Sequence, residues 1–435
     1  MEPQLQFGQP EQEQQQPLLR VRCSACLPVA PSKSMIPYHL TYDQLKVDLY
    51  QAYYDVRRHK RQKAYQVRFE ADLDANIGML CDELWTRTYK ARASACFIIT
   101  DPKKREVFAA DFRDRIVHHL YYNYTHSLYE RTFIEDTYSC IPGRGTHYGI
   151  HRLQQHICRE SQNYTLPCYV LKMDIQGYFM HIQRERLLSI CLATLDKMAT
   201  HRILKQVPTT WAERIDMDFV RYLTREIVLL DPTQDCYVAG DICDWGDLPA
   251  KKSLFLSPVG SGLPIGNLTS QLFSNVYMNV LDQYMKRVLH CEHYGRYVDD
   301  FFVVSTDREW LHSLIADVRC FVKQSLGLTL HEGKTQIINV RYGVEFLGAM
   351  VKPHHIVVGR TAYRRMYPKI QHALQNIPQS NSSLISFGGL LCHGTNYGRI
   401  KEMFDKNKVF AGVPYLNRNL PLSPAVCRFF LFNDL

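Results

Sequence analysis

The chain of 435 residues is 46% hydrophobic and 22% charged, and its 52 Lys and Arg against 43 Asp and Glu give a net charge of +9. This length allows a large buried core with two or three cooperating lobes, and the positive balance suits a polyanionic partner. No apolar run reaches the roughly 18 residues of a membrane helix, and fourteen cysteines without a secretory signal or a paired metal spacing predict reduced thiols in a cytoplasmic protein.

The first 35 residues have a composition of their own. Gln, Pro and Glu dominate from Gln4 to Pro17, and this low hydrophobicity predicts a flexible tail. A helix is expected to begin near Thr41, because its spacing to Gln44 fits a capping box. The end of this helix is basic, and it would lie along a nucleic-acid backbone or form a solvated helix end stabilised by the helix dipole. Its basic residues are Arg57, Arg58, Lys60, Arg61 and Lys63.

A basic turn over residues 101–107 leads into a predicted strand. Its Lys103 and Arg105 are candidates for phosphate binding, because the guanidinium fork matches phosphate oxygens. A solvated surface turn is the alternative interpretation. The Gly-rich segment at residues 142–147 carries little functional information when it is taken alone.

Two segments place carboxylates next to strand-like runs. The first is the apolar run 170–173 followed by Asp174, which would otherwise cap the next helix. The second is the pair Asp299 and Asp300, which lies between two short strand-like runs, 296–298 and 301–304, as at the tip of a hairpin. By itself the pair is more typical of a solvated turn, since Asp is a preferred turn residue.

Residues 262–267 predict a loop whose glycines allow close approach of the backbone to a ligand. The apolar residues that follow recur in pairs every four positions, which predicts a helix with Thr269 or Ser270 as its N-cap. We expect this apolar stripe to be core. It consists of Leu272, Phe273, Val276, Tyr277, Val280, Leu281, Tyr284, Met285, Val288 and Leu289.

In chain order these patterns resemble the motifs of reverse transcriptases, and the resemblance covers residues from about 95 to 350. The fingers motifs of prokaryotic enzymes are similar to residues 101–107 and 142–147. The palm motifs A, B, C and D resemble residues 170–179, 262–271, 297–300 and 327–335, and the primer-grip hairpin resembles residues 345–348.

The resemblance implies an α+β, right-hand polymerase fold. We expect N-terminal helices and fingers over residues 36–168 and a palm of antiparallel sheet plus helices over residues 169–358. A small helical thumb would follow over residues 359–435, and the flexible tail would occupy residues 1–35. Residues 196–262 interrupt the palm motifs, and they would form either a palm elaboration or a docking surface.

The resemblance also implies RNA-directed DNA synthesis with two metal ions. Such ions, about 3.5–4 Å apart, stabilise charge on the attacking and leaving oxygens. Asp174 and Asp299 would be the main Mg²⁺ ligands, with Mn²⁺ as an alternative ion. Asp300 and the Ile175 carbonyl would support them, and Lys334 would donate a proton to the pyrophosphate leaving group.

Further residues would contact the substrates. Arg105 and Lys103 would grip the triphosphate of the incoming nucleotide. Phe179 would place its ring against the sugar 2′ position and exclude ribonucleotides, unless it only packs in the palm core. The remaining nucleotide-binding candidates are Ile175, Ile265, Gly266, Asn267 and Gln271, and the primer grip would consist of Phe346, Leu347 and Gly348.

The string from Ile265 to Gln271 departs from the Gln-Gly type of retroviral and group II intron enzymes and resembles diversity-generating retroelement enzymes of bacteria and phages. This implies error-prone copying of a template RNA from a primer with deoxynucleoside triphosphates, and a small basic accessory protein or another operon-encoded partner. Ile265 cannot donate a hydrogen bond to the nucleotide, which removes one means of discrimination. The alternatives are an antiphage defence reverse transcriptase and a nonpolymerising RNA-binding scaffold.

Overall fold

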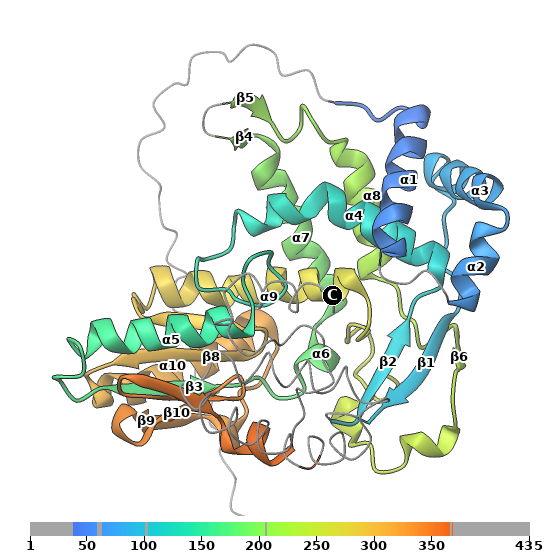
Figure 1. The fold of residues 1–435 in the computed structure, drawn as a ribbon. Coiled ribbons are helices and arrows are strands. Elements are labelled where there is room, and N and C mark those ends of the chain that lie inside the picture. The colour runs from blue at the N-terminus through green and yellow to red at the C-terminus, as the bar shows by residue number, and fades with distance from the viewer. Residues whose placement is uncertain (1–37, 59–62, 101–102, 205–206, 366–367, 369–435) are drawn as a thin grey trace, which may run out of the picture. The chain divides into compact units, whose positions relative to one another are not determined.

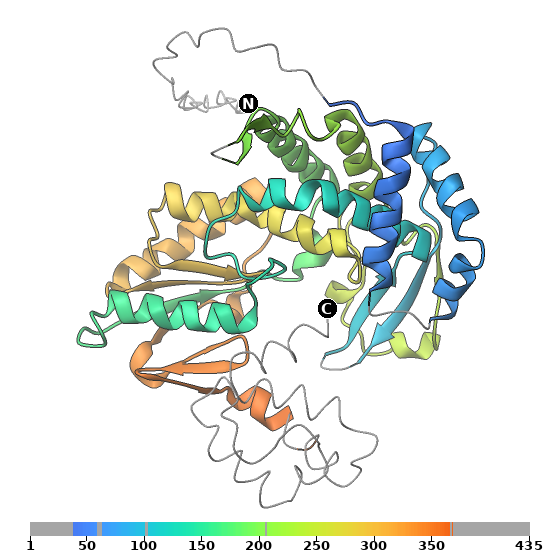
Figure 2. The same cartoon turned by 45° about the horizontal axis from the view of Figure 1, so that its top comes forward.

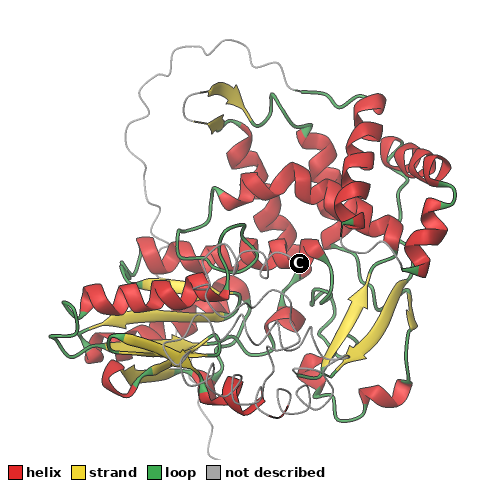
Figure 3. Cartoon of the chain, viewed as in Figure 1, coloured by secondary structure: helices red, strands yellow, loops and turns green. Residues whose placement is uncertain are grey.

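The computed structural model describes residues 38–368 except for 59–62, 101–102, 205–206 and 366–367 (Figure 1). The predicted tail at residues 1–35 and nearly all of the predicted thumb at residues 359–435 lie outside the described residues. The same holds for Lys60 and Arg61 of the basic helix end. Figure 3 shows that the described strands gather in separate sheets, with helices between and around them.

A group of helices forms the N-terminal part of the described chain. Helix α1 begins as predicted, since the Thr41 hydroxyl accepts a hydrogen bond of 3.3 Å from the Gln44 amide. Its buried face, which includes Leu45 and Leu49, packs against α4, and α3 packs against α1. The helices are α1 (Tyr42–Arg57), α2 (Ala64–Glu70), α3 (Leu73–Trp85) and α4 (Phe112–Glu130).

A three-stranded sheet has the order β2–β1–β6, and its first two strands lie between α3 and α4 in the chain. Its strands are β1 (Ser94–Ile99), β2 (Arg105–Ala109) and β6 (Cys236–Val238). β2 runs antiparallel to β1, whereas β6 runs parallel to it. The buried Glu106 of β2 accepts hydrogen bonds from the Trp245 indole at 2.7 Å and the Ser253 hydroxyl at 2.9 Å. The interval 196–262 therefore contributes a strand and side-chain contacts to the sheet that contains β1 and β2.

The palm sheet has the order β7–β8–β3–β9, and every neighbouring pair is antiparallel. Its strands are β3 (Tyr169–Met173), β7 (Tyr294–Tyr297), β8 (Asp300–Ser305) and β9 (Gln336–Asn339). In the pairing of β3 with β8, Met173 lies opposite Phe301. This register brings the residue after β3 next to the first residue of β8.

Helices cover both faces of the palm sheet. Successive residues of a strand point to opposite faces, and the β8 side chains divide in this way. Phe302 and Val304 belong to a cluster with α5 (Thr146–Glu160), whereas Phe301 and Val303 belong to the large core that also contains α9 (Leu268–Arg287) and α10 (Arg308–Leu326). In the view of Figure 2, α9 runs alongside α4, which it contacts. Helix α9 thereby joins the palm to the N-terminal helices.

The helix predicted after the glycine loop is present, but its predicted N-cap is wrong. Helix α9 begins at Leu268 with Asn267 as N-cap, and Thr269 and Ser270 are buried inside the helix. Asn267 has extended backbone angles, so the chain enters the helix earlier than the sequence pattern indicates. Most of the predicted apolar stripe is buried or half-buried, but Val288 is 60% exposed because the helix has ended there.

The remaining elements complete the described chain. Helices α7 and α8 pack against each other and against α4. Among the described residues, no helix has both the length and the apolar character that crossing a membrane requires. The elements are α6 (Tyr178–His181), α7 (Arg184–Ala199), β4 (Arg202–Leu204), β5 (Val207–Thr210), α8 (Met217–Val228), and a sheet of β10 (Val344–Phe346), β11 (Ala349–Lys352) and β12 (His355–Val358).

We predict that Gly266→Ala lowers the free energy of unfolding by about 1–3 kcal/mol. Gly266 has a φ of +122°, and a Cβ there would lie 2.8 Å from Val107 Cγ1 and 3.2 Å from the Phe108 carbonyl oxygen. Chemical denaturation measures the change. The control is Gly78→Ala in α3, where no described atom outside the adjoining residues and helix backbone lies within 4 Å of the added Cβ and where helix propensity favours Ala by about 0.5–1 kcal/mol. Equal stability of the two variants would contradict the prediction.

Candidate active site

The candidate site is built on the turn between β7 and β8. Tyr297 pairs with Asp300, so Val298 and Asp299 form a two-residue turn at the tip of the hairpin. Val298 has a φ of +56°, a left-handed conformation that is unfavourable for a β-branched side chain. Backbone strain of this kind persists only where the surroundings fix it, and it is common at functional sites.

Two side chains hold the backbone of this turn. The Val298 amide donates to the Ser139 hydroxyl at 3.2 Å, and Arg296 Nη1 donates to the Val298 carbonyl at 2.9 Å. Ser139 also donates to the side-chain oxygen of Asn275 in α9 at 3.2 Å. Ser139 therefore holds the amide of the strained Val298 and Arg296 holds its carbonyl, and Ser139 is in turn bonded to Asn275.

Arg296 is part of a buried ion pair that the sequence analysis did not identify. Its Nε and Nη2 donate to the two Asp282 oxygens at 2.8 and 2.6 Å, and both side chains are 0% exposed. The Tyr294 hydroxyl donates to the same carboxylate at 2.6 Å. Asp282 lies in α9, so the pair connects the hairpin to that helix. The sequence holds one hint of this pair, because Arg296 is a charged residue in a predicted strand and Asp282 is an acid in a predicted core helix.

The structure brings the three predicted carboxylates together. Asp174 follows β3 directly and is only 6% exposed, and the β3–β8 register sets it beside the Asp299–Asp300 turn. Desolvation, together with the charges of Asp174 and Asp300, raises the pKa of the half-buried Asp299 to about 7. Desolvation also raises the pKa of Asp300, with a further contribution from Asp174. The three carboxylates thus repel one another in a poorly solvated place.

Lys334 lies at the same place. Its ammonium donates to Asp174 Oδ2 at 2.8 Å. Burial acts to lower the pKa of Lys334, but the hydrogen bond to Asp174 and the charges of the three carboxylates raise it overall. Lys334 is therefore protonated at neutral pH.

A backbone bridge positions both Lys334 and Ile175. The His331 amide donates to the Asp174 carbonyl at 2.8 Å, and the Gln176 amide donates to the Thr329 carbonyl at 2.9 Å. This antiparallel bridge pairs Ile175 with Leu330, and its two hydrogen bonds do not use the Ile175 carbonyl.

The donor chemistry of the site fits a hard divalent cation. Carboxylate oxygens are the ligands that Mg²⁺ prefers. A bound cation would reduce the repulsion among these acids, which the ammonium of Lys334 already reduces in part. Within the described part of the chain, however, no group of three or more His, Cys, Asp or Glu side chains is arranged to hold a metal ion.

Phe179 and Ile265 meet next to the fingers sheet. Both half-buried side chains pack on a small apolar cluster that contains Phe108 of β2. The Phe179 carbonyl accepts a hydrogen bond of 2.8 Å from the Leu263 amide, and the Phe108 amide donates to the Ile265 carbonyl at 3.0 Å. The segments after β3 and before α9 therefore adjoin β2.

Other predicted nucleotide-binding residues make contacts within the protein. Asn267 is buried and accepts a hydrogen bond of 3.3 Å from the Ala110 amide. Gln271 is exposed, and its side-chain oxygen accepts from the Cys140 thiol at 3.4 Å. Lys103 and Arg105 are exposed, with Arg105 at the start of β2.

The predicted primer grip forms the β10–β11 hairpin. Leu347 and Gly348, with φ of +50° and +82°, make its turn. Phe346 is 1% exposed and packs edge-on against Phe302 of the palm, with ring centroids 5.2 Å apart. Its side chain therefore packs in the core beneath the sheet.

Comparison with known proteins decides the family. Residues 102–351 match the family model described as reverse transcriptase (RNA-dependent DNA polymerase). The chain belongs to the reverse transcriptase family. This confirms the expected fold and the expected class of enzyme.

The reverse transcriptase also resembles individual known proteins. It is 25% identical over 349 residues to protein YkfC of Escherichia coli strain K12, a match that covers 72% of this chain and 78% of YkfC. Similar solved structures include apo telomerase of Candida tropicalis, with 12% identity, a TM-score of 0.45 and coverage of 74% of this chain and 58% of that one. Telomerase of Candida albicans, solved with a fragment of telomeric RNA, has 11% identity, a TM-score of 0.42 and coverage of 79% and 60%. The reverse transcriptase spans about three fifths of these two telomerase chains.

We predict that Arg296→Met lowers the free energy of unfolding by about 3–5 kcal/mol, because it leaves Asp282 buried without its cation. Urea denaturation measures the loss. Arg287→Met, at an exposed position of the same helix as Asp282, serves as the control and should change little. The double variant Arg296→Met/Asp282→Leu should recover part of the loss. A single variant as stable as the wild type would show that the ion pair does not support the hairpin.

Proposed function

We propose that this reverse transcriptase copies an RNA template into DNA at a centre formed by Asp174, Asp299 and Asp300. The observation that carries the proposal is the convergence of these carboxylates from the end of β3 and the β7–β8 turn, where, beside desolvation, the charge of Asp174 raises the pKa values of Asp299 and Asp300. Family membership over residues 102–351 supports the same reaction. The partners would be a template RNA, a primer or growing cDNA, and deoxynucleoside triphosphates.

The carboxylates are proposed to hold Mg²⁺, with Mn²⁺ as an alternative. Asp174 and Asp299 would be the principal ligands, and Asp300 and the Ile175 carbonyl would support them. When bound, two such ions supply charge stabilisation for the attacking and leaving oxygens. The buried Arg296 holds the Asp299 turn in one conformation, which limits the rearrangement needed when substrate arrives.

Lys334 is proposed to be the general acid. Its raised pKa keeps a proton on Nζ at neutral pH, 2.8 Å from Asp174 Oδ2. Transfer of that proton to the leaving pyrophosphate would neutralise its developing charge. The exposed Lys103 and Arg105 would bind the triphosphate oxygens from the fingers, because both side chains are accessible near the start of β2.

The subtype is proposed to be a diversity-generating retroelement enzyme that copies with errors and works with a small basic accessory protein or another operon-encoded partner. Ile265 packs with Phe179 in an apolar cluster. Its side chain therefore offers no hydrogen bond that could help to discriminate a correct from an incorrect base pair between the incoming nucleotide and the template. An antiphage defence enzyme is the alternative, and a nonpolymerising RNA-binding scaffold is less favoured because the carboxylates and Lys334 lie together. Near-identical repeats beside the gene that differ at adenines would favour diversification over defence.

Asp299→Asn should abolish primer extension on an RNA template. The change removes one negative charge while the shape is kept, and we expect the rate to fall at least about a hundredfold. The control is Asp317→Asn, an exposed acid of α10, which should extend primers at the wild-type rate. If Asp299→Asn extends primers as fast as the control, or if the wild type makes no product with Mg²⁺, the proposed activity is wrong.

Phe179→Ala should admit ribonucleotides, because the ring proposed to overlap the 2′ hydroxyl is removed. We expect the preference for deoxynucleotides, measured as a ratio of kcat/KM values, to fall about tenfold or more, which corresponds to about 1.4 kcal/mol. Phe108→Leu, in the same apolar cluster, serves as a control for loosened packing. An unchanged sugar preference in Phe179→Ala, or an equal change in both variants, would refute the role of the ring.

A further inference from the structure

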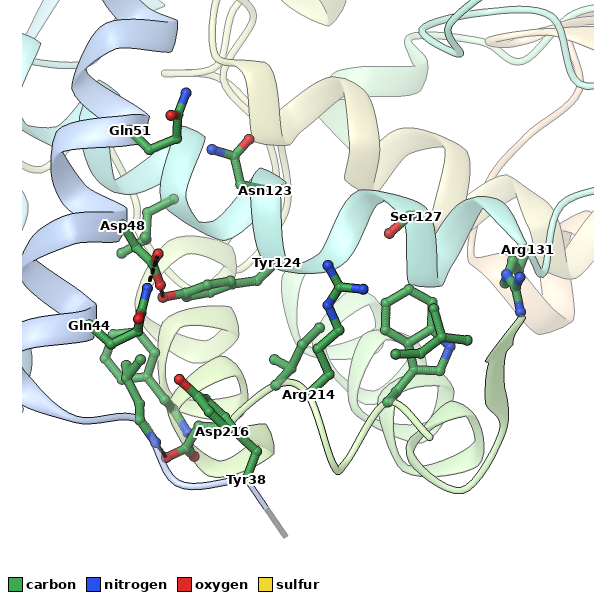
Figure 4. Close-up of a pocket in the computed structure, with 16 residues that line it drawn as sticks. Tyr38, Gln44, Asp48, Gln51, Asn123, Tyr124, Ser127, Arg131, Arg214 and Asp216 are labelled. Atoms are coloured by element: carbon green, nitrogen blue, oxygen red, sulfur yellow. Dashed lines mark hydrogen bonds between the residues drawn. The ribbon is translucent and has the colours of Figure 1, made fainter. Parts of the chain in front are cut away.

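A cavity of about 530 Å³ is lined by side chains of α1, α4 and α8, among others (Figure 4), and its charged groups balance one another. Asp48 and Asp216 offset the charges of Arg131 and Arg214, and the Gln44 amide already donates to Asp48 at 2.8 Å. The cavity therefore presents no net charge to a ligand, whereas a lysine of the palm sheet has a direct connection to the candidate active site.

This lysine, Lys172, lies in β3 in the middle of the palm sheet. Phe302 of β8 and Gln336 of β9 lie opposite it in the two ladders, so the three side chains share one face of the sheet. Asp300 begins β8 two residues before Phe302 and projects from the same face. Desolvation raises the pKa of Asp300, and the charge of Lys172 is the largest effect that opposes this rise. Lys172 thus stands diagonally opposite one of the three carboxylates.

The ammonium of Lys172 also reaches the β10–β11 hairpin, which belongs to a different sheet. Its Nζ donates to the Glu345 carbonyl at 2.6 Å and lies 5.8 Å from the centroid of the Phe346 ring. Phe346 and Ala349 pair next to the two-residue turn. The carbonyl of the preceding Glu345 therefore points away from β11, because residues alternate between the two sides of an antiparallel ladder. Lys172 supplies a partner to this outward carbonyl.

The bond from Lys172 gives direction to the packing of the hairpin on the palm. In the described chain the strands of the palm sheet and of the β10–β11–β12 sheet form separate ladders. Apolar contacts, such as that between the Phe302 and Phe346 rings with centroids 5.2 Å apart, press the two sheets together. Burial of apolar surface has no preferred direction, whereas a hydrogen bond from a charged donor fixes a distance and an angle and is stronger than a neutral one.

We propose that Lys172 is a positioning residue that holds the β10–β11 hairpin, and with it the primer end, in place beside the carboxylates. The turn at Leu347 and Gly348 is the part of the hairpin expected to contact the primer. Movement of this turn would displace the primer 3′ hydroxyl from the carboxylates, and small displacements of reacting groups slow a reaction strongly. The inference rests on the proposed function, because it concerns the primer of that reaction.

Hydrogen exchange of the full chain, followed by mass spectrometry, tests the link itself. Lys172→Met keeps a long unbranched side chain but removes the ammonium, so the amides of β10 and β11 should exchange about tenfold faster. Lys172→Arg keeps a cationic donor and should restore most of the protection. Lys352→Met, the same change at a half-buried position of β11, is the control and should exchange as the wild type does. The amides of α10 should be unaffected in every variant.

Fluorescence anisotropy tests the consequence for the primer. Lys172→Met should raise the Kd of a DNA primer annealed to an RNA template about fivefold, while the Kd of the template RNA alone stays within about twofold of the wild-type value. A general loss of structure would weaken both. Lys323→Met, at an exposed position of α10, controls for the loss of one positive charge and should bind both nucleic acids as the wild type does.

Three results would overturn the inference. The hairpin could exchange as slowly in Lys172→Met as in the wild type, it could exchange faster while primer–template affinity stays the same, or the annealed primer could add no affinity in the wild type. The two proposals can fail separately. A wild type that makes no DNA, with primer affinity still lost in Lys172→Met, would defeat the polymerase activity alone. A wild type that extends primers, with unchanged primer affinity in Lys172→Met, would defeat the role of Lys172 alone.

Discussion

The buried pair of Arg296 and Asp282 is the interaction on which the candidate site depends. It joins a strand of the palm sheet to a core helix at a place from which water is excluded. Such a pair adds little net stability, because desolvation offsets most of its attraction, but a partner left alone would be costly. The pair therefore fixes which way α9 and the hairpin face each other. The left-handed Val298 is tolerated because this anchor holds its carbonyl.

The electrostatics of the site follow from that rigidity. A flexible turn would let Asp299 and Asp300 move apart and recover water, whereas the fixed hairpin keeps them near Asp174. Desolvation, followed by repulsion from Asp174, raises the pKa values of both residues, and the charge of the Lys334 ammonium opposes part of this rise. The carboxylates repel one another, so their close approach has to be maintained by other contacts of the hairpin. These are the ion pair of Arg296 with Asp282 and the hydrogen bonds of the uncharged Ser139 and Asn275.

Sequence patterns predicted the family and the core helix, because these depend on short motifs and on periodicity. The catalytic role of the three carboxylates, which rests on the same motifs, stays a prediction. The sequence patterns did not indicate contacts between residues far apart in the sequence. The side chain of Asn267, a residue predicted to bind nucleotide, accepts a hydrogen bond from the Ala110 amide. The ring of Phe346, a residue predicted to belong to the primer grip, packs on Phe302. The sequence places Arg296 in a predicted strand and Asp282 in a predicted core helix, but it does not show that they pair, because the pairing exists only after the hairpin docks on the helix.

The parallel strand β6 has a consequence for how the chain acquires its structure. Its partner β1 precedes the first palm strand, whereas β6 follows it, so fingers and palm are interleaved along the chain. No single cut between residues separates the two sheets into independent pieces. During synthesis, one edge of β1 lacks this partner until Cys236 and its neighbours have been made, and the pairing requires closure of a long loop. The two sheets are therefore expected to fold in one cooperative step, which is slow compared with the formation of local helices.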